Sequence, residues 1–194
     1  LLLQCAAGHR DLRSCPTRRS SDLPYRADLV QGANVMVMRE MCGGSFLTTH
    51  RGIENLTDGG QRAFDLNEYT SFEIERFARA SFDVARLRKG KIISVDKSNV
   101  VVAGALWREI VGRIGSDEYP DVKLQHFFAD NAIYQLGLNP TAFDVIMADN
   151  LFGDLISDQA GIISGSLGIL PSACLPGIPK PGESIGPEIG RAHV

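Results

Sequence analysis

Short apolar runs and longer periodic stretches alternate along the chain between residues 34 and 164. The short runs are typical of buried strands. In the longer stretches apolar residues recur every three or four positions, as on one face of a helix. The runs predict strands over 34–38, 91–95, 122–128 and 143–147, and the stretches predict helices over 70–88, 102–114, 131–136 and 152–164. Because the two kinds alternate, we expect an α/β sandwich built on a mostly parallel sheet.

The helix predicted over 70–88 has a clear start signal. Thr70 and Glu73 have the spacing of a capping box, in which each side chain bonds the backbone of the other residue. Three phenylalanines of this region are predicted to lie in the core: Phe72, Phe77 and Phe82. The polar, glycine-containing segment before this helix predicts an extended hairpin arm that returns along 63–66.

The two ends of the chain differ from the middle. Residues 1–24 show neither period, and Thr17–Leu23 and Glu188–Val194 look like translations of the two adapters of a sequencing library. We therefore expect residues 1–24 and 187–194 to be non-native and to lie outside the fold. A basic N-terminal arm and a flexible tail are the alternative. The Gly-, Ser- and Pro-rich stretch 166–186 is interpreted as the start of a return to another domain.

Composition narrows the function classes. With 44% hydrophobic residues the chain is expected to be globular rather than disordered. The net charge of the chain is −3, of which the first 24 residues contribute +2 and the last eight contribute zero. Residues 25–186 therefore carry −5, which excludes the basic surface typical of a nucleic-acid-binding protein. No run approaches the ~20 apolar residues of a membrane span. The four cysteines show no metal or disulfide spacing, so we expect a reducing compartment, the cytoplasm.

Acidic residues follow two of the predicted strands, at the edge where parallel α/β proteins carry their working residues. Asp130 follows strand 122–128, and Asp154 and Asp158 follow strand 143–147. Asp154 and Asp158 are four residues apart, so their carboxylates project from the same helix face. Oxygen ligands suit Mg²⁺ or Mn²⁺, and Asp130 would complete such a site. The alternative is that Asp154 favours the helix N-terminus and Asp158 is simply solvated.

Basic residues follow two strands as well. Lys97 comes after strand 91–95. A lysine that is partly removed from water can act as a general base. The commoner alternative is a surface lysine whose ammonium reaches the solvent. Arg39 can hold a substrate carboxylate through its planar guanidinium, and an exposed ion pair with Glu40 is the alternative. His126 lies within a predicted strand, where we expect a packed or hydrogen-bonded imidazole.

Motifs between residues 34 and 174 carry a more specific signal. They are Arg39-Glu40-x-x-Gly43-Gly44, Ser94–Val100, Leu106-Trp107-Arg108, Tyr119–Val122, Asp130-Asn131-Ala132, Asn150–Asp158 and Gly165–Ala173. In kind and order they resemble the β-decarboxylating dehydrogenases, most closely the members that act on 3-isopropylmalate.

The resemblance implies an isopropylmalate dehydrogenase-like sandwich, with 25–165 as the central catalytic and dimerisation domain and 43–66 as an intersubunit hairpin arm. It also implies oxidative decarboxylation of 3-isopropylmalate in leucine biosynthesis, with NAD and Mg²⁺ or Mn²⁺. The implied catalytic residues are Lys97, as the base, and Asp130. The implied metal ligands are Asp130, Asp154 and Asp158. The implied binding residues are Arg39 and Asn99 for substrate and Asn99, Val100 and Asn150 for the cofactor.

In this family Lys97 and Asp130 would come from one subunit and Asp154 with Asp158 from the other, so the resemblance implies a homodimer. The chain departs from the family at one position. Where the family has an acidic tyrosine two residues after the Gly-Gly pair, Phe46 has no proton to donate. There are three ways to account for this phenylalanine. Water, Ser45 or His50 donates the proton instead; the second half-reaction is slow; or the substrate is another acid, such as isocitrate, homoisocitrate or tartrate. The family's adenosine-holding segment is missing, so a non-catalytic dimerising fragment is a third hypothesis.

Overall fold

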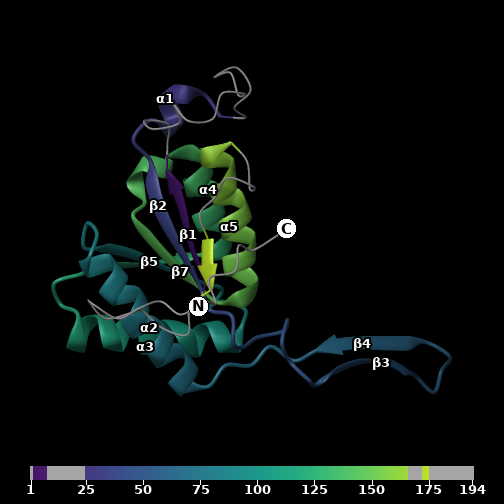
Figure 1. Cartoon of the computed structure of the whole chain (residues 1–194). Coiled ribbons are helices and arrows are strands. Elements are labelled where there is room, and N and C mark those ends of the chain that lie inside the picture. The colour runs from purple at the N-terminus through teal and green to yellow at the C-terminus, as the bar shows by residue number, and fades with distance from the viewer. Residues whose placement is uncertain (1, 8–24, 166–171, 175–194) are drawn as a thin grey trace.

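The computed structural model describes residues 2–7, 25–165 and 172–174. A six-stranded sheet forms the middle layer, in the order β6-β5-β7-β2-β1-β8 (Figure 1). Its strands are β1 (Leu2–Ala7), β2 (Asn34–Arg39), β5 (Lys91–Asp96), β6 (Lys123–Phe128), β7 (Val145–Ala148) and β8 (Ser172–Cys174). Strands β6, β5, β7 and β2 run parallel, whereas β1 is antiparallel to both of its neighbours. The predicted α/β sandwich with a mostly parallel sheet is confirmed.

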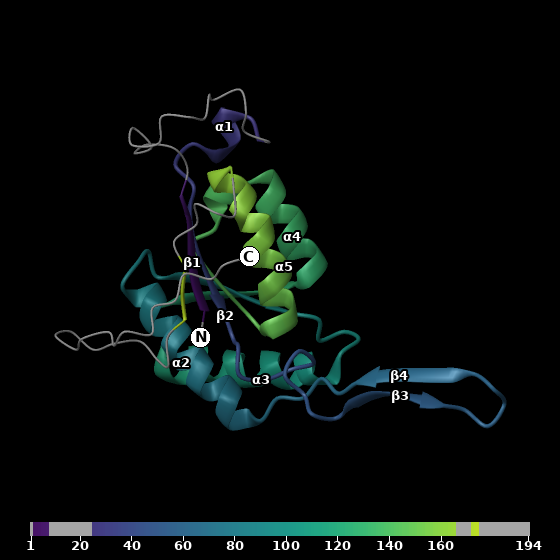
Figure 2. The same ribbon diagram turned by 45° about the vertical axis from the view of Figure 1, so that its right-hand side comes forward.

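The helices connect these strands and cover both faces of the sheet (Figures 1 and 2). They are α1 (Ala27–Val30), α2 (Ser71–Arg86), α3 (Val102–Glu118), α4 (Ala129–Leu138), α5 (Asn150–Ser164) and a 3₁₀ turn at Pro140–Ala142. The capping box predicted for α2 is present: the Thr70 hydroxyl accepts from the Glu73 amide, and the Glu73 carboxylate accepts from the Thr70 amide. Helices α3, α4 and α5 extend beyond their predicted limits.

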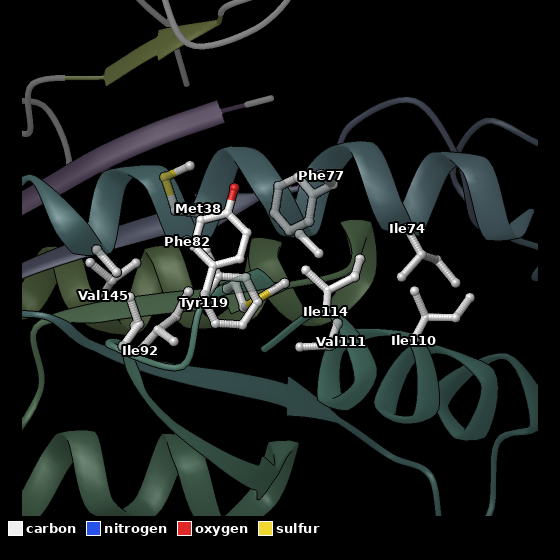
Figure 3. Packing of buried hydrophobic residues seen from close by; sticks show 14 of the residues in the cluster. Met38, Ile74, Phe77, Phe82, Ile92, Ile110, Val111, Ile114, Tyr119 and Val145 are labelled. Carbon is white, nitrogen blue, oxygen red and sulfur yellow. The ribbon is translucent and has the colours of Figure 1, made fainter. Parts of the chain in front are cut away.

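Two hydrophobic cores lie on opposite faces of the sheet, because successive strand side chains point to opposite sides. Ile92 packs towards α2 and α3, while its neighbour Ile93 packs towards α4 and α5. In β7, Val145 and Ile146 divide in the same way. Figure 3 shows the first core, in which side chains of α2 and α3 meet those of the sheet. The rigid layers hold the strand ends in fixed register.

A hairpin arm extends away from the sandwich (Figures 1 and 2). It consists of β3 (Arg51–Asn55) and β4 (Gln61–Asp65), paired in a separate two-stranded sheet. This confirms the predicted hairpin, although its second strand begins two residues earlier than expected. Ile53 on this arm is 72% exposed. An isolated two-stranded hairpin is marginally stable in water, so the arm gains little stability from its own strand pairing.

Two expectations about local structure are wrong. Residues 2–7, part of the N-terminal stretch expected to lie outside the fold, form β1 and pair along their whole length with β2, because backbone pairing needs no marked side-chain period. The expectations for residues 8–24 and 187–194 fall outside the described residues and stay predictions. Phe72 was expected in the core and is 81% exposed. It lies about 200° around the helix from Ile74, the first buried residue of α2. Within the described ranges, no helix is long and apolar enough to cross a membrane.

Candidate active site

Four strands bring the candidate residues to one edge of the sheet. The parallel strands β6, β5, β7 and β2 end next to one another, with Asp96 opposite Phe128 and Arg39 opposite Ala148. The residues that follow these ends, including Lys97, therefore line the same edge. This is the edge at which open parallel sheets bind ligands, and the predicted residues Arg39, Lys97, Asp130 and Asp154 meet there in ion pairs.

Lys97 and Asp130 form an ion pair across the ends of β5 and β6. The Lys97 side chain is 28% exposed and that of Asp130 is 69% exposed. The ammonium of Lys97 holds the pKa of the Asp130 carboxyl below its ordinary value, with a further contribution from backbone hydrogen bonding. The Lys97 side chain thus has a partner at the site edge, and that partner is the other predicted catalytic residue; its role as a base stays a prediction.

Arg39 is held against the start of α5. Its Nε and Nη2 atoms donate to Asn150 Oδ1 at 3.0 and 2.8 Å, and its Nη1 atom donates to Asp154. Asn150 is buried and donates in turn to the Gly43 carbonyl at 3.0 Å. At Gly153, an added Cβ would lie 2.7 Å from Arg39 Cγ, so only glycine allows this approach. The guanidinium therefore has a fixed orientation towards the site.

The sequence left open an exposed ion pair between Arg39 and Glu40 as the alternative to substrate binding by Arg39. Glu40 does not form that pair. Neighbouring strand residues point to opposite faces, and the Glu40 side chain is fully buried. It accepts from the backbone amides of Cys42 and Gly43 at 2.7 and 3.0 Å, and from Arg76 at 3.1 Å. Glu40 thus shapes the turn that leads towards Phe46.

Asp154 and Asp158 lie on α5, one helical turn apart as predicted, and Asp158 is exposed. Oxygen donors on one helix face fit Mg²⁺ or Mn²⁺. In the described part of the chain no three His, Cys, Asp or Glu side chains gather closely enough to hold a metal. Asp130 follows β6, which is separated by β5 from β7, a span of about 10 Å. One chain therefore offers two of the three predicted carboxylates together.

A buried carboxylate that the sequence did not indicate lies beneath the site. Asp149 caps α5 by accepting from the Phe152 amide at 2.7 Å, and it is 8% exposed. Burial raises the pKa of Asp149 to about 6, and the nearby Asp96 and Glu40 carboxylates add to the rise. The sequence feature that could have indicated a role for Asp149 is its position directly before the Asn150–Asp158 motif.

The remaining predicted residues lie on the surface of the same edge. Asn99 and Val100 follow Lys97 in a turn in which the Val100 and Val101 amides donate to the Lys97 carbonyl. Both side chains are exposed, Val100 by 71%. The Phe46 ring lies 5.8 Å from the Arg39 guanidinium carbon, so position 46 does face the site. The cofactor role of Asn150 stays a prediction, and its contacts add a structural role in orienting Arg39.

Comparison with known proteins agrees with this arrangement. The family model for isocitrate/isopropylmalate dehydrogenase matches residues 7–186. The 3-isopropylmalate dehydrogenase of Caulobacter vibrioides is 48% identical over 157 residues, which cover 81% of this chain and 45% of that protein. The chloroplastic 3-isopropylmalate dehydrogenase 2 of Arabidopsis thaliana is 44% identical over 84% of this chain and 41% of its own length.

A solved structure supports the same relationship. Isocitrate dehydrogenase from Methylococcus capsulatus superimposes with a TM-score of 0.73 at 26% identity, covering 89% of this chain and 47% of that one. The chain spans less than half the length of the curated relatives it matches. From the matched family model and these similarities, the chain belongs to the isocitrate/isopropylmalate dehydrogenase family.

Proposed function

We propose that the protein to which this chain belongs catalyses the NAD- and Mg²⁺- or Mn²⁺-dependent oxidative decarboxylation of 3-isopropylmalate. The observation that carries the proposal is the single edge at which the Lys97–Asp130 pair and the Arg39–Asp154 pair both lie. These are the base, the carboxylates and the substrate-binding cation that such a reaction needs. The names of the most similar relatives support 3-isopropylmalate as the substrate.

Each side chain has a defined task in this reaction. Lys97 acts as the base for the substrate hydroxyl: its ammonium first gives up a proton, for which the adjacent Asp130 carboxylate is an acceptor, and the neutral amine then takes the hydroxyl proton. Arg39 holds a substrate carboxylate through its planar fork, which Asn150 keeps oriented. Asp154 and Asp158, with Asp130, would hold the divalent ion, and Asn99, Val100 and Asn150 would contact NAD. When bound, the two groups supply charge stabilisation at the substrate oxygens and a hydride acceptor.

The site is proposed to form between two copies of the chain. Asp130 and the α5 carboxylates belong to one metal site in the family pattern, yet among the described residues of one chain no three carboxylates gather. A second copy that presents its Asp130 to the first copy's α5 supplies the third carboxylate. The hairpin arm with its exposed Ile53 is suited to strand pairing between copies. We propose a cytoplasmic homodimer; the compartment rests on the cysteine usage alone.

The direct test is an assay of the complete polypeptide encoded by the gene. NADH formation should require both 3-isopropylmalate and Mg²⁺ or Mn²⁺, and isocitrate, homoisocitrate and tartrate should be poorer substrates. Faster turnover of one of those acids would move the protein to another specificity within the family. Absence of turnover with all four, in a dimer that retains its fold, would support the third hypothesis, a non-catalytic dimerising protein.

Two substitutions assign the roles. Lys97→Ala should lower kcat by about 100-fold or more without changing the dimer, because it removes a positioned general base; undiminished turnover would exclude Lys97 from that role. Asp154→Asn should raise the concentration of Mn²⁺ needed for half-maximal binding, measured calorimetrically in the absence of substrate. Unchanged metal affinity would exclude Asp154 as a ligand.

A further inference from the structure

Asp96, the residue directly before Lys97, is a buried carboxylate with several partners. Its side chain is 1% exposed. Oδ1 accepts from the Ser98 amide at 2.9 Å, so the carboxylate fixes the backbone on the far side of Lys97. Burying a carboxylate this deeply costs free energy unless a cation lies beside it. The cation that pairs with Asp96 therefore also stabilises the turn around Lys97.

The cation is Arg108 of α3. Its Nε and Nη2 atoms donate to the two Asp96 oxygens at 2.9 and 3.1 Å, which is the bidentate geometry that a planar guanidinium provides. His126 is the other nearby base, with Nδ1 at 4.0 Å from Asp96. In the described part of the chain its Nδ1 is buried without a hydrogen-bond partner, and burial together with the Arg108 charge lowers the pKa of His126. Arg108 is therefore the cation that forms the ion pair with Asp96.

Arg108 also reaches the element that carries Asp130. Its guanidinium carbon lies 4.8 Å from the centroid of the Phe128 ring. The Lys97 ammonium lies 5.9 Å from the same centroid. Phe128 is the last residue of β6, opposite Asp96 in the register and two residues before Asp130. One guanidinium therefore contacts both strand ends from which Lys97 and Asp130 project.

Close packing prevents α3 from moving independently of this turn. At Gly104 an added Cβ would lie 3.1 Å from the Ser98 nitrogen and 3.2 Å from the Lys97 backbone. One turn along the helix, the Trp107 indole donates to the Ser94 hydroxyl at 3.1 Å. Both Trp107 and Ser94 are buried. Helix α3 is thus a rigid support, and Arg108 is the side chain through which it holds the site.

We propose that Arg108 is a positioning residue for the Lys97–Asp130 pair, joining the ends of β5 and β6 through Asp96 and Phe128. The kinetic consequence rests on the proposed function of Lys97 as the base; the positional consequence does not. Without the guanidinium, Asp96 is a buried carboxylate with no adjacent cation, and the turn that carries Lys97 has to rearrange. A displacement of about 1 Å at a catalytic group can cost about 100-fold in rate.

The kinetic test compares Arg108→Gln and Arg108→Lys with a matched control in the complete polypeptide. The control is Arg113→Gln on the same helix, which loses an exposed pair with Glu75 and has no contact with Asp96. We expect Arg108→Gln to lower kcat by about 100-fold with little change in KM, and Arg108→Lys to restore part of the loss. Wild-type kcat in Arg108→Gln, or no recovery in the lysine variant, would overturn the proposal.

A second readout does not depend on activity. The rate at which a small anhydride acetylates Lys97 is measured by peptide mass spectrometry, with the exposed Lys91 and Lys123 as internal references. We expect Lys97 to react several-fold faster in Arg108→Gln, because its pairing with Asp130 is loosened, and at the wild-type rate in Arg113→Gln. An unchanged rate in folded Arg108→Gln would overturn the proposal. A wild-type protein without turnover would reject the proposed function, while the labelling still decides whether Arg108 positions Lys97.

Discussion

Replacing Asp149 by asparagine should stabilise the protein at neutral pH and leave its stability nearly unchanged at about pH 4. The side chain is 8% exposed, and the Phe152 amide is the hydrogen-bond donor it satisfies. Burial, with the nearby Asp96 and Glu40 carboxylates, raises its pKa from the ordinary 3.8 to about 6. Asparagine keeps an oxygen that can accept from Phe152 but carries no charge.

The sign and size of the effect follow from proton linkage. Between pH 3.8 and about 6 the folded protein binds a proton that the unfolded chain has lost. The free energy of unfolding therefore falls as the pH rises through this window and is constant above it. At about 1.4 kcal/mol per pKa unit, ionised Asp149 costs about 3 kcal/mol at neutral pH. Losing the favourable charge at the helix N-terminus offsets up to about 1 kcal/mol, so the net gain should be about 2 kcal/mol.

Urea unfolding of the two proteins at matched concentration measures this gain. Trp107 is the sole tryptophan of the sequence and is 2% exposed in the core, so its fluorescence follows the loss of tertiary structure. Curves are recorded from pH 7.5 to about pH 4. The difference between variants at each pH cancels the carboxyl groups that lie far from Asp149 and retains Asp149 together with its coupling to Asp96 and Glu40. Equal slopes with denaturant are needed before midpoints are compared.

A control of opposite sign is available at Asp121. This exposed carboxylate pairs with Arg86, which lowers its pKa, so its contribution to stability is present above pH 3.8 and is lost below it. Asp121→Asn should therefore not stabilise the protein at neutral pH. Equal stability of wild type and Asp149→Asn at pH 7.5, or a gain that does not shrink as the pH falls, would refute the linkage reasoning.

Two further substitutions test the site and the core. Phe46→Tyr should raise kcat for oxidative decarboxylation, since it adds a proton donor to a ring 5.8 Å from the Arg39 guanidinium; an unchanged kcat would mean that another group supplies the proton. Arg88→Met should destabilise the protein by about 3–5 kcal/mol in the same urea assay, because it leaves the 1% exposed Asp144 side chain without its cation. Arg86→Met, which breaks the exposed pair with Asp121, should destabilise the protein much less, because solvent screens that pair.

Local chemistry explains which features could be predicted from the sequence. The capping box of Thr70 and Glu73 involves residues three positions apart, so its spacing alone determines the contact. The common helix face of Asp154 and Asp158 follows from helical geometry in the same way. Both predictions needed nothing beyond the identity of neighbouring residues, and both agree with the structure.

Contacts between distant segments could not be predicted in this way. Arg39 meets Asp154 because β2 and β7 are neighbours in the sheet, an order that no local pattern contains. The burial of Asp149 depends on the packing of α5 against that edge. Arg108 was visible as part of a motif, but its contacts with Asp96 and Phe128 need the register of β5 with β6. Family resemblance indicated which residues matter and left open how this chain holds them.

The two ion pairs at the edge suit a site that takes up charged ligands. In this structure Lys97 pairs with Asp130 and Arg39 with Asp154, so two of the three candidate ligand carboxylates have a cation from their own chain. The carboxylate side of each pair is open to solvent, with the Asp130 and Asp154 side chains 69% and 40% exposed. A competing cation therefore has access to both carboxylates. In the proposed dimer, a divalent ion held by Asp154 of one copy and Asp130 of the other would free Arg39 of the first copy and Lys97 of the second, and a substrate with a hydroxyl and carboxylates needs both cations.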